Sequence, residues 1–315
     1  MLSIVVPIFN EEESVDAFYK RLKPEVSKLS KIHEIIFVDD GSTDKSLSIL
    51  KKLSEKDKTI RIFSFRRNQG KAEALTLGFQ QAKGERIVTL DADLQDRPEE
   101  IHKLLAKLDE GYEVVCGWRK DRKDAAKMKI ISKFFNYLTG LVWGVKLHDY
   151  NCGLKAYTKD AAKSMHLYGG MHRFIPLLAT EQGFAVTEVA IVHDKRQFGK
   201  SKYGFGKIFN LPDMFTLLFL TKYGTRPLHF FAAVGSILFL IGLGCFLFVW
   251  IDLQIIHHLS IGRRPLFFVS LALMLAGIQV SFSGFLADFM VFLTRTPQLT
   301  NEGVCQFLKY VSDKK

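Results

Sequence analysis

The stretch that most constrains this chain is Val88-Thr89-Leu90-Asp91-Ala92-Asp93-Leu94-Gln95-Asp96, a β-prone apolar run that ends in acidic and amide side chains. Parallel α/β sheets present side chains to ligands at the ends of their strands. Alternate residues of an extended segment face the same side, so Asp91, Asp93 and Gln95 are predicted to direct their oxygens toward one point. Such oxygens suit Mg²⁺ or Mn²⁺. The alternative is a solvated loop that caps a helix near Pro98.

Short apolar strands alternate with amphipathic helices around this stretch. The predicted strands cover residues 4–8, 34–38, 60–65, 86–90 and 114–117. Helices are predicted to begin at residues 10–14, to run from about 44 through 53 and over 72–82, and to begin again near 98. This alternation indicates an α/β fold with a mostly parallel, doubly wound sheet.

Two long apolar segments follow, over about residues 227–252 and 265–293. Each exceeds the roughly 20 residues that cross a bilayer core of about 30 Å, so both are predicted to be transmembrane helices. A buried hairpin of a large soluble domain is the alternative. Their small residues permit close helix contact and allow a homo-oligomer. Asp288 is costly in lipid and is expected to face a partner helix, an oligomer seam or the interface.

These features predict four regions. They are a domain over 1–203 that is expected to be catalytic, an interfacial amphipathic helix region over 204–225, a two-helix membrane anchor over 226–295 and a C-terminal tail over 296–315. A buried core helix is the alternative for the second region. No signal peptide precedes the first strand, so a multi-pass membrane protein with a cytoplasmic catalytic domain is expected. Lys222, Arg226 and Arg295 favour that orientation, whereas Arg263 and Arg264 oppose it.

The formal net charge is +11, and much of the basic excess lies in residues 120–133 and 195–207. A basic face beside a bilayer attracts anionic lipids and phosphates. Nucleic acid is the alternative partner, but the sequence has no nucleic-acid-binding motif, so none is expected. The four cysteines are scattered without a Cys-x-x-Cys pair. They are therefore expected to be reduced and unpaired in a reducing compartment.

Two further predicted strand ends carry polar turns. After the second strand, the Asp39-Asp40-Gly41-Ser42 turn can accept hydrogen bonds from a base or a ribose, although it also reads as a common turn and helix cap. After the third strand, Arg66-Arg67-Asn68-Gln69-Gly70-Lys71 opens a helix and suits an anion. A solvated loop is the equal alternative there.

Four segments in order resemble the inverting family-2 glycosyltransferases. They are Val5-Val6-Pro7-Ile8-Phe9-Asn10-Glu11, Val38-Asp39-Asp40-Gly41-Ser42, Arg67-Asn68-Gln69-Gly70-Lys71 and Leu90-Asp91-Ala92-Asp93-Leu94-Gln95. The resemblance is greatest to the polyprenyl-phosphate branch, which includes dolichol-phosphate mannose synthases and bactoprenol glucosyl transferases. It spans about residues 2–205, and the two apolar segments resemble the anchors of membrane-bound members. It implies a Rossmann-like nucleotide-sugar-binding domain.

The resemblance also implies a donor site. Its nucleotide-sugar-binding residues would be Pro7, Phe9, Glu11, Asp39, Asp40, Asn68, Gly70, Lys71 and Asp91. Within that set, one of the two adjacent aspartates would contact the edge of the base. Asp91, Asp93 and Gln95 would hold Mg²⁺ or Mn²⁺ and, through it, the donor diphosphate. The ion would stabilise the departing nucleoside diphosphate, which makes Asp93 a catalytic candidate.

On the acceptor side, His148-Asp149-Tyr150-Asn151-Cys152-Gly153-Leu154-Lys155 resembles a family motif. A phosphomonoester acceptor is mostly ionised near pH 7 and needs little proton abstraction. Asp149 is therefore interpreted as a positioning residue, with a general base and a plain helix cap as the alternatives. His172 and Arg173 fall near the acceptor in relatives, although a lone histidine is more often structural.

Basic side chains would bind the acceptor phosphate. The candidates are Arg119, Lys129, Ser132, Arg196 and Ser201, with Lys202 as a further catalytic candidate. Guanidinium and ammonium groups are the usual partners of phosphate oxygens. The helix that carries Lys127 and Lys129 departs from the family pattern, because some relatives carry paired arginines there. A solvated helix face is as good an interpretation of those two lysines.

The predicted reaction is a metal-dependent, inverting transfer of a sugar. It would move from a UDP- or GDP-linked donor to a polyprenyl monophosphate, such as undecaprenyl or dolichyl phosphate, at the cytoplasmic membrane face. The lipid-linked sugar would then serve modification of an envelope glycan. One alternative is a processive polysaccharide synthase, but the sequence lacks the Gln-x-x-Arg-Trp motif and the additional spans of those enzymes. A membrane-tethered nucleotide-binding scaffold without catalysis is the other alternative.

Overall fold

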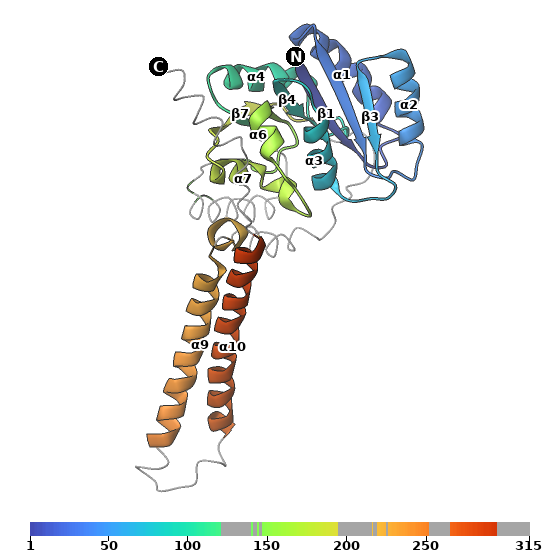
Figure 1. The fold of residues 1–315 in the computed structure, drawn as a ribbon. Helices are drawn as coiled ribbons and strands as arrows, with labels where there is room; N and C mark the ends of the chain where they lie inside the picture. Colours follow the sequence, from blue (N-terminus) through green and yellow to red (C-terminus); the bar gives the residue numbers. More distant parts are fainter. Residues whose placement is uncertain are drawn as a thin grey trace. The chain divides into compact units, whose positions relative to one another are not determined.

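A computed structural model describes residues 1–120, 147–194, 226–251 and 265–294, together with 140, 144, 216 and 219–224. The chain divides into two compact units, Met1–Asp213 and Met214–Lys315. The described part of the first unit is an α/β domain, and that of the second is mainly a pair of long helices (Figure 1). The finer predicted boundaries at residues 203, 225 and 295 stay predictions.

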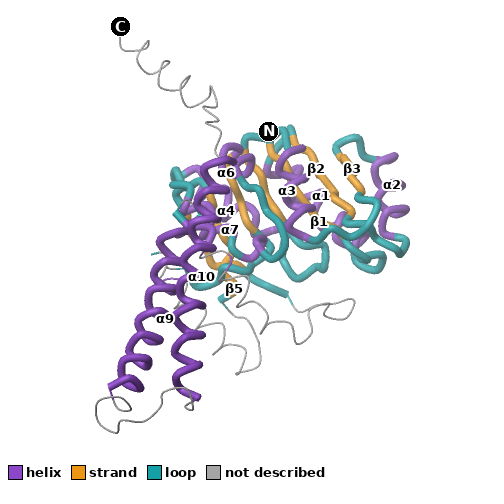
Figure 2. The backbone as a smooth tube through the Cα atoms, turned by 60° about the horizontal axis from the view of Figure 1, so that its bottom comes forward, coloured by secondary structure: helices purple, strands orange, loops and turns teal. Residues whose placement is uncertain are grey.

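The described strands of the first unit form one sheet in the order β3-β2-β1-β4-β6-β5-β7. Figure 2 shows β3, β2 and β1 side by side in it. Its strands are β1 (Leu2–Ile8), β2 (His33–Asp39), β3 (Ile60–Ser64), β4 (Arg86–Thr89), β5 (Val114–Arg119), β6 (Lys155–Thr158) and β7 (Val186–Ile191). β1 pairs in parallel with β2 and β4, as do β2 with β3 and β5 with β7. Only β6 runs antiparallel to its neighbours among the described strands. The predicted mostly parallel sheet is confirmed.

Helices connect these strands in the predicted alternation. The helical segments are α1 (Val15–Leu29), α2 (Ser46–Lys56), α3 (Lys71–Gln81), η1 (Pro98–Glu100), α4 (Ile101–Asp109), α6 (Lys159–Ser164), η2 (Met171–Arg173) and α7 (Ile175–Glu181). The predicted helices over the first 110 residues are confirmed, with ends displaced by a few residues. The predicted strand over 114–117 extends to Arg119.

The core forms because alternate strand residues face opposite sides of the sheet. Ile4 and Val6 of β1 belong to the same buried cluster as Phe18 of α1 and Leu104 of α4. On the other face, α3 lies so close that a Cβ at Gly78 would stand 2.2 Å from a methyl carbon of Val5. Helices therefore cover both faces, and loops at the carboxyl ends of β1, β2 and β4 remain to form a site.

The second unit contains η4 (Phe219–Tyr223), α9 (Pro227–Trp250) and α10 (Pro265–Thr294). Both views show α9 and α10 side by side (Figures 1 and 2). Both are long and apolar enough to cross a membrane, and they match the two predicted spans. Asp288 is half-buried on α10, and its predicted role stays a prediction. The predicted interfacial helix lies mostly outside the described residues, as does the tail.

Small residues let the two helices approach closely, as predicted. A Cβ at Gly235 would stand 2.3 Å from the Ser281 hydroxyl oxygen, and one at Gly284 would stand 2.5 Å from the Phe231 Cβ. By contrast, a Cβ at Gly244 would meet nothing within 4 Å. The contacting glycines are thus used within the helix pair.

Replacing Gly235 by leucine is expected to force α9 and α10 apart, because the added side chain overlaps Ser281. Gly244→Leu is the matched control, since it adds the same side chain to open space. Spin labels at the exposed positions Leu240 and Leu275 report the distance between the helices. A longer or broader distribution is expected in the Gly235 variant only, and an unchanged distribution there would contradict the described packing.

The described cysteines are unpaired, as predicted. Cys116 and Cys152 are buried thiols in the first unit, and Cys245 lies in α9. Burial raises the pKa of the Cys116 thiol to about 12. Since the thiolate is the reactive form, this cysteine is chemically inert in the folded protein. Cys305 lies outside the described residues.

Candidate functional site

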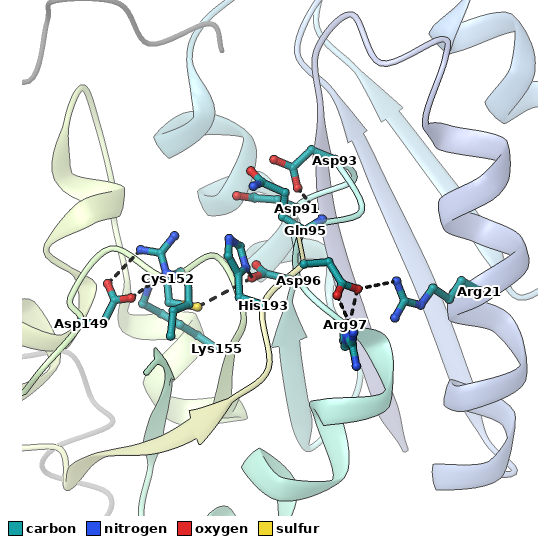
Figure 3. A network of polar contacts seen from close by, with 12 residues as sticks. Arg21, Asp91, Asp93, Gln95, Asp96, Arg97, Asp149, Cys152, Lys155 and His193 are labelled. Carbon is teal, nitrogen blue, oxygen red and sulfur yellow. Dashed lines mark hydrogen bonds and ion pairs between the residues drawn. The ribbon is translucent and has the colours of Figure 1, made fainter. Parts of the chain in front are cut away.

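The loop after β4 presents its polar residues in alternation. Asp91, Asp93 and Gln95 are half-exposed, whereas Ala92, Leu94 and Asp96 are buried. Figure 3 shows the first three side chains gathered beside one another, with Asp96 directed toward His193. Leu94 has a φ of 61°, a left-handed conformation that a bulky side chain seldom adopts. The strained conformation of Leu94 thus keeps the side-chain oxygens of Asp91, Asp93 and Gln95 on one side of the loop, as predicted.

Lys71 neutralises the first member of that set. Its ammonium lies 2.5 and 2.7 Å from the two carboxylate oxygens of Asp91. Burial favours the neutral acid, but the charge and hydrogen bonds of Lys71 outweigh it, and the pKa of Asp91 is lowered. Asp93 accepts the backbone N–H of Gln95 at 3.2 Å. The turn is therefore ordered by its own polar groups.

The set of side chains formed by Asp91, Asp93 and Gln95 has the ligand chemistry that a hard divalent ion prefers. It consists of two carboxylates and an amide, all oxygen donors. Within the described part of the chain, no group of three or more histidine, cysteine, aspartate and glutamate side chains could hold a metal by themselves. The metal-binding role predicted for Asp91, Asp93 and Gln95 stays a prediction.

The two aspartates at the end of β2, Asp39 and Asp40, are turned inward. Asp39 is 1% and Asp40 4% exposed. Asp39 accepts hydrogen bonds from the backbone N–H of Ser42 and the hydroxyl of Ser64. Asp40 accepts the side-chain amide N–H of Asn68 at 2.9 Å and the backbone N–H groups of Gln69 and Gly70 at 2.7 to 3.1 Å. Burial raises the pKa of Asp40 despite these bonds.

Asp40 therefore fixes the loop that precedes α3. Gly70 is the N-cap of that helix and has a φ of 110°, and Lys71 is the first residue of the helix. Hydrogen bonds from Gly70 to Asp40 and from Lys71 to Asp91 thus link the loops after β2 and β4, two of the segments predicted to bind the donor. The predicted contact of Asp39 or Asp40 with a base stays a prediction, and both carboxylates already have internal partners.

Gly41 is required where these two loops meet. It has a φ of +67°, and a Cβ there would lie 2.4 Å from the carbonyl carbon of Arg67. Gly41→Ala is expected to lower the free energy of unfolding by about 1–3 kcal/mol or more, measured by denaturant titration. Gly111→Ala is the control, because Gly111 also has a positive φ but meets nothing within 4 Å. Equal losses in the two variants would contradict the contact.

Pro7, Phe9 and Glu11 lie at the end of β1 and in the loop beyond it, and each is half-exposed. The backbone N–H of Glu11 donates to the Ser46 hydroxyl at 2.8 Å, and its carboxylate accepts the Ser14 hydroxyl at 2.7 Å. The loop after β1 is therefore tied to the start of α2. The three residues border the same edge of the sheet as Asp91.

Arg119 and Asp149 form a buried ion pair with each other. The guanidinium donates two hydrogen bonds, at 2.6 and 3.0 Å, to the two carboxylate oxygens. The side chains are 11% and 12% exposed. Although burial opposes the charged form, Asp149 raises the pKa of Arg119. These two residues were predicted to have separate roles, and their pairing was not predicted.

A second polar network fastens the loop after β4 to the segment after β7. Asp96 lies 3.2 Å from Nδ1 of His193, and Arg97 donates two hydrogen bonds to Asp194. Arg21 of α1 joins the same carboxylate at 3.3 Å (Figure 3). No sequence pattern indicated these contacts, because their partners lie 97 to 173 residues apart.

Several predicted site residues lie outside the described residues. They are Lys127, Lys129, Ser132, Arg196, Ser201 and Lys202. Their predicted roles toward the acceptor phosphate and in catalysis stay predictions.

A pocket opens beside Asp91. Its lining comes from the strand ends, from α3 and from the 151–155 segment; it comprises Pro7, Lys71, Leu75, Thr89, Asp91, Asn151, Cys152, Gly153, Lys155, Tyr157, His172 and Ile175. A Cβ at Gly153 would lie 2.6 Å from an Asp91 oxygen, so the segment passes directly over that carboxylate. Lys155 is the last residue of the predicted acceptor-side motif, and no role of its own was predicted for it.

The class of protein follows from this architecture and from comparison with known proteins. The family model described as Glycosyl transferase family 2 matches residues 3–165, and the chain belongs to that family. It is a glycosyltransferase. Two curated relatives are similar over most of their length.

The dodecaprenyl-phosphate galacturonate synthase of Rhizobium johnstonii is 37% identical over 92% of this chain and 87% of its own. The undecaprenyl-phosphate 4-deoxy-4-formamido-L-arabinose transferase of Salmonella choleraesuis is 39% identical over 75% of this chain and 72% of its own. Among solved structures, glucosyl-3-phosphoglycerate synthase from Mycobacterium tuberculosis, in complex with Mn²⁺ and UDP-glucose, has a similar fold. Its TM-score is 0.53 at 20% identity, over 71% of this chain and 79% of that one.

Proposed function

We propose that this enzyme transfers a sugar, with inversion, from a UDP- or GDP-linked donor to a polyprenyl monophosphate. The observation that carries the proposal is the gathering of Asp91, Asp93, Gln95 and Lys71 at the ligand-binding edge of a family-2 fold. Both curated relatives carry a polyprenyl phosphate in their names, and they differ in the sugar. The names thus support the acceptor class and leave the sugar open.

The donor is proposed to lie across the ends of β1, β2 and β4. Pro7, Phe9 and Glu11 would border the nucleotide, and Asp40 would act through the loop of Asn68 and Gly70 that it holds. Asp93 and Gln95, with Asp91, would hold Mg²⁺ or Mn²⁺ against the diphosphate. The fold neighbour solved with Mn²⁺ and UDP-glucose supports a divalent ion. When bound, the ion supplies positive charge for the departing diphosphate.

The acceptor phosphate is proposed to lie on the Arg119 side of the site. Because Arg119 already pairs with Asp149, the carboxylate would hold the guanidinium in place and share it with the phosphate. This role is one of positioning rather than proton abstraction. Lys129, Ser132, Arg196 and Ser201 would add further phosphate contacts, and Lys202 would assist catalysis.

The two apolar helices are proposed to anchor the enzyme in a membrane as a multi-pass protein, with the catalytic domain on the cytoplasmic face. Their length and hydropathy support this assignment. Contacts of Gly235, Gly277 and Gly284 are made within the helix pair, so a homo-oligomer would use other surfaces. No nucleic-acid partner is proposed.

Product analysis tests the function. The purified full chain in detergent is incubated with undecaprenyl phosphate, Mn²⁺ or Mg²⁺ and a panel of UDP- and GDP-sugars, and the lipid fraction is analysed by mass spectrometry. We expect one sugar residue on the lipid phosphate. A lipid-independent glycan chain would instead indicate a processive synthase, and tight nucleotide binding without any product would indicate a scaffold.

A further inference from the structure

Lys155 is a buried cation on the wall of the pocket beside Asp91. It is the first residue of β6 and is only 3% exposed. Its ammonium donates a hydrogen bond to the carbonyl oxygen of Cys152. Among the described residues, no carboxylate lies within salt-bridge distance of it, and an ammonium has three N–H donors.

Such a group is costly to bury. Lysine is almost never fully buried without a paired anion, because the desolvation of the charge is not repaid. The sheet itself would accommodate an apolar side chain at this position, since Ala156 and Tyr157 of β6 are fully buried, as is Cys116, the partner of Lys155 on β5. The charge therefore points to an anion that the described part of the chain does not supply within salt-bridge distance.

The other charges of the pocket leave an excess of one positive charge. Lys71 and Lys155 carry one each, and Asp91 carries the single negative charge among the residues that line the pocket. His172 is neutral near pH 7, because burial, with the charges of Lys71 and Arg173, lowers its pKa to about 3. Its buried Nδ1 has no hydrogen-bond partner within the described part of the chain.

We propose that this pocket receives a carboxylate on the donated sugar, so that the preferred donor is a nucleotide-linked uronic acid. The proposal rests on the proposed function and names its substrate class. Lys155 would donate to one carboxylate oxygen, and His172 and Asn151, which also line the pocket, would contact the sugar. A carboxylate accepts several charge-assisted hydrogen bonds in one plane, which matches donors arriving from different walls.

Depth separates this anion from the phosphates of the two substrates. Thr89 and Tyr157, which line the pocket with Lys155, are buried, whereas Asp93 and Gln95 are half-exposed at the edge of the sheet. A diphosphate with its metal ion would lie against the exposed oxygens. The buried wall that carries Lys155 would then be left to a substituent of the sugar.

The experiment uses the full chain in detergent and two matched donor pairs. UDP-galacturonate is compared with UDP-galactose, and UDP-glucuronate with UDP-glucose, by kcat/KM for transfer to undecaprenyl phosphate and by calorimetric Kd. We expect at least one acid donor to be preferred over its neutral partner by about tenfold to a hundredfold, the range of hydrogen bonds to charged groups. Lys155→Met should reduce that preference to near one.

Two controls keep the result interpretable. Lys159→Met removes a lysine that pairs with Glu85 at the surface, and it should leave the preference unchanged. The melting temperature of Lys155→Met should equal or exceed that of the wild type, because an uncompensated buried charge is removed. A preference in binding without any transfer would contradict the proposed function and support the pocket assignment.

Three results would overturn the inference. The wild type could show no preference for either acid donor in binding or transfer. Lys155→Met could keep the full preference, which would assign the discrimination elsewhere. The same variant could weaken acid and neutral donors by the same factor, which would place a phosphate, common to both, against Lys155.

Discussion

Replacing Asp93 by asparagine is expected to lower kcat/KM for lipid-linked product by about a hundredfold to a thousandfold. The side chain keeps its size, and its amide oxygen can still accept the backbone N–H of Gln95. The variant therefore removes a charge without removing the turn. A metal ion contributes several kcal/mol to stabilising a departing phosphate, and each 1.36 kcal/mol corresponds to about tenfold in rate.

The control for this variant is Asp16→Asn, which neutralises an aspartate paired with Lys20 on the surface of α1. It should leave turnover unchanged, and both variants should melt at the wild-type temperature. Full turnover by Asp93→Asn, with the wild-type melting temperature, would contradict the assignment of Asp93 to the metal. An excess of Mn²⁺ should recover part of the lost activity if the variant only weakens binding of the ion.

Breaking the buried pair of Arg119 and Asp149 is expected to have the largest effect on stability. Arg119→Met removes the guanidinium that pairs with the Asp149 carboxylate in a largely buried site, and such changes cost about 3–5 kcal/mol. For a domain of this size, a loss of 3 kcal/mol corresponds to a fall of about 6–12 °C in melting temperature. The double variant Arg119→Met with Asp149→Leu should recover much of that loss, because neither charge is then buried alone.

Arg86→Met is the matched control. Arg86 pairs with Asp109, but the two side chains are 48% and 55% exposed, so the loss should stay below about 1 kcal/mol. An Arg119→Met protein that melts like the wild type and has only a raised KM for polyprenyl phosphate would contradict the positioning role. It would assign the guanidinium to the acceptor alone.

The first half of the catalytic domain was predictable from sequence because its elements are long, regular and close to one another in the chain. The strands ending at Ile8, Asp39 and Thr89 are apolar runs followed by polar turns, and the helices between them are amphipathic. In contrast, β6 has only four residues and no alternating pattern, and the pairing partners of β7 lie far away in the sequence. Neither β6 nor β7 was therefore predicted from the sequence.

In the candidate site, too, the local features were predictable from the sequence and the contacts between distant segments were not. The oxygen-bearing loop after β4 was foreseen, because alternation in an extended segment is a local property. The inward turn of Asp40 could not be read from a turn sequence, since its partners Asn68, Gln69 and Gly70 belong to another loop. Likewise, the pairing of Arg119 with Asp149 joins residues 30 positions apart, and nothing near either residue marks the contact.

A divalent ion that joins a nucleotide to the loop of Asp91, Asp93 and Gln95 is the central element of the proposed function. Calorimetric titration of the wild-type chain with UDP and GDP, in Mn²⁺ and again in excess EDTA, tests this element directly. We expect one of the nucleotides to bind in Mn²⁺ and to lose most of its affinity in EDTA. Equal affinity in the two solutions, or no binding of either nucleotide in Mn²⁺, would contradict the account.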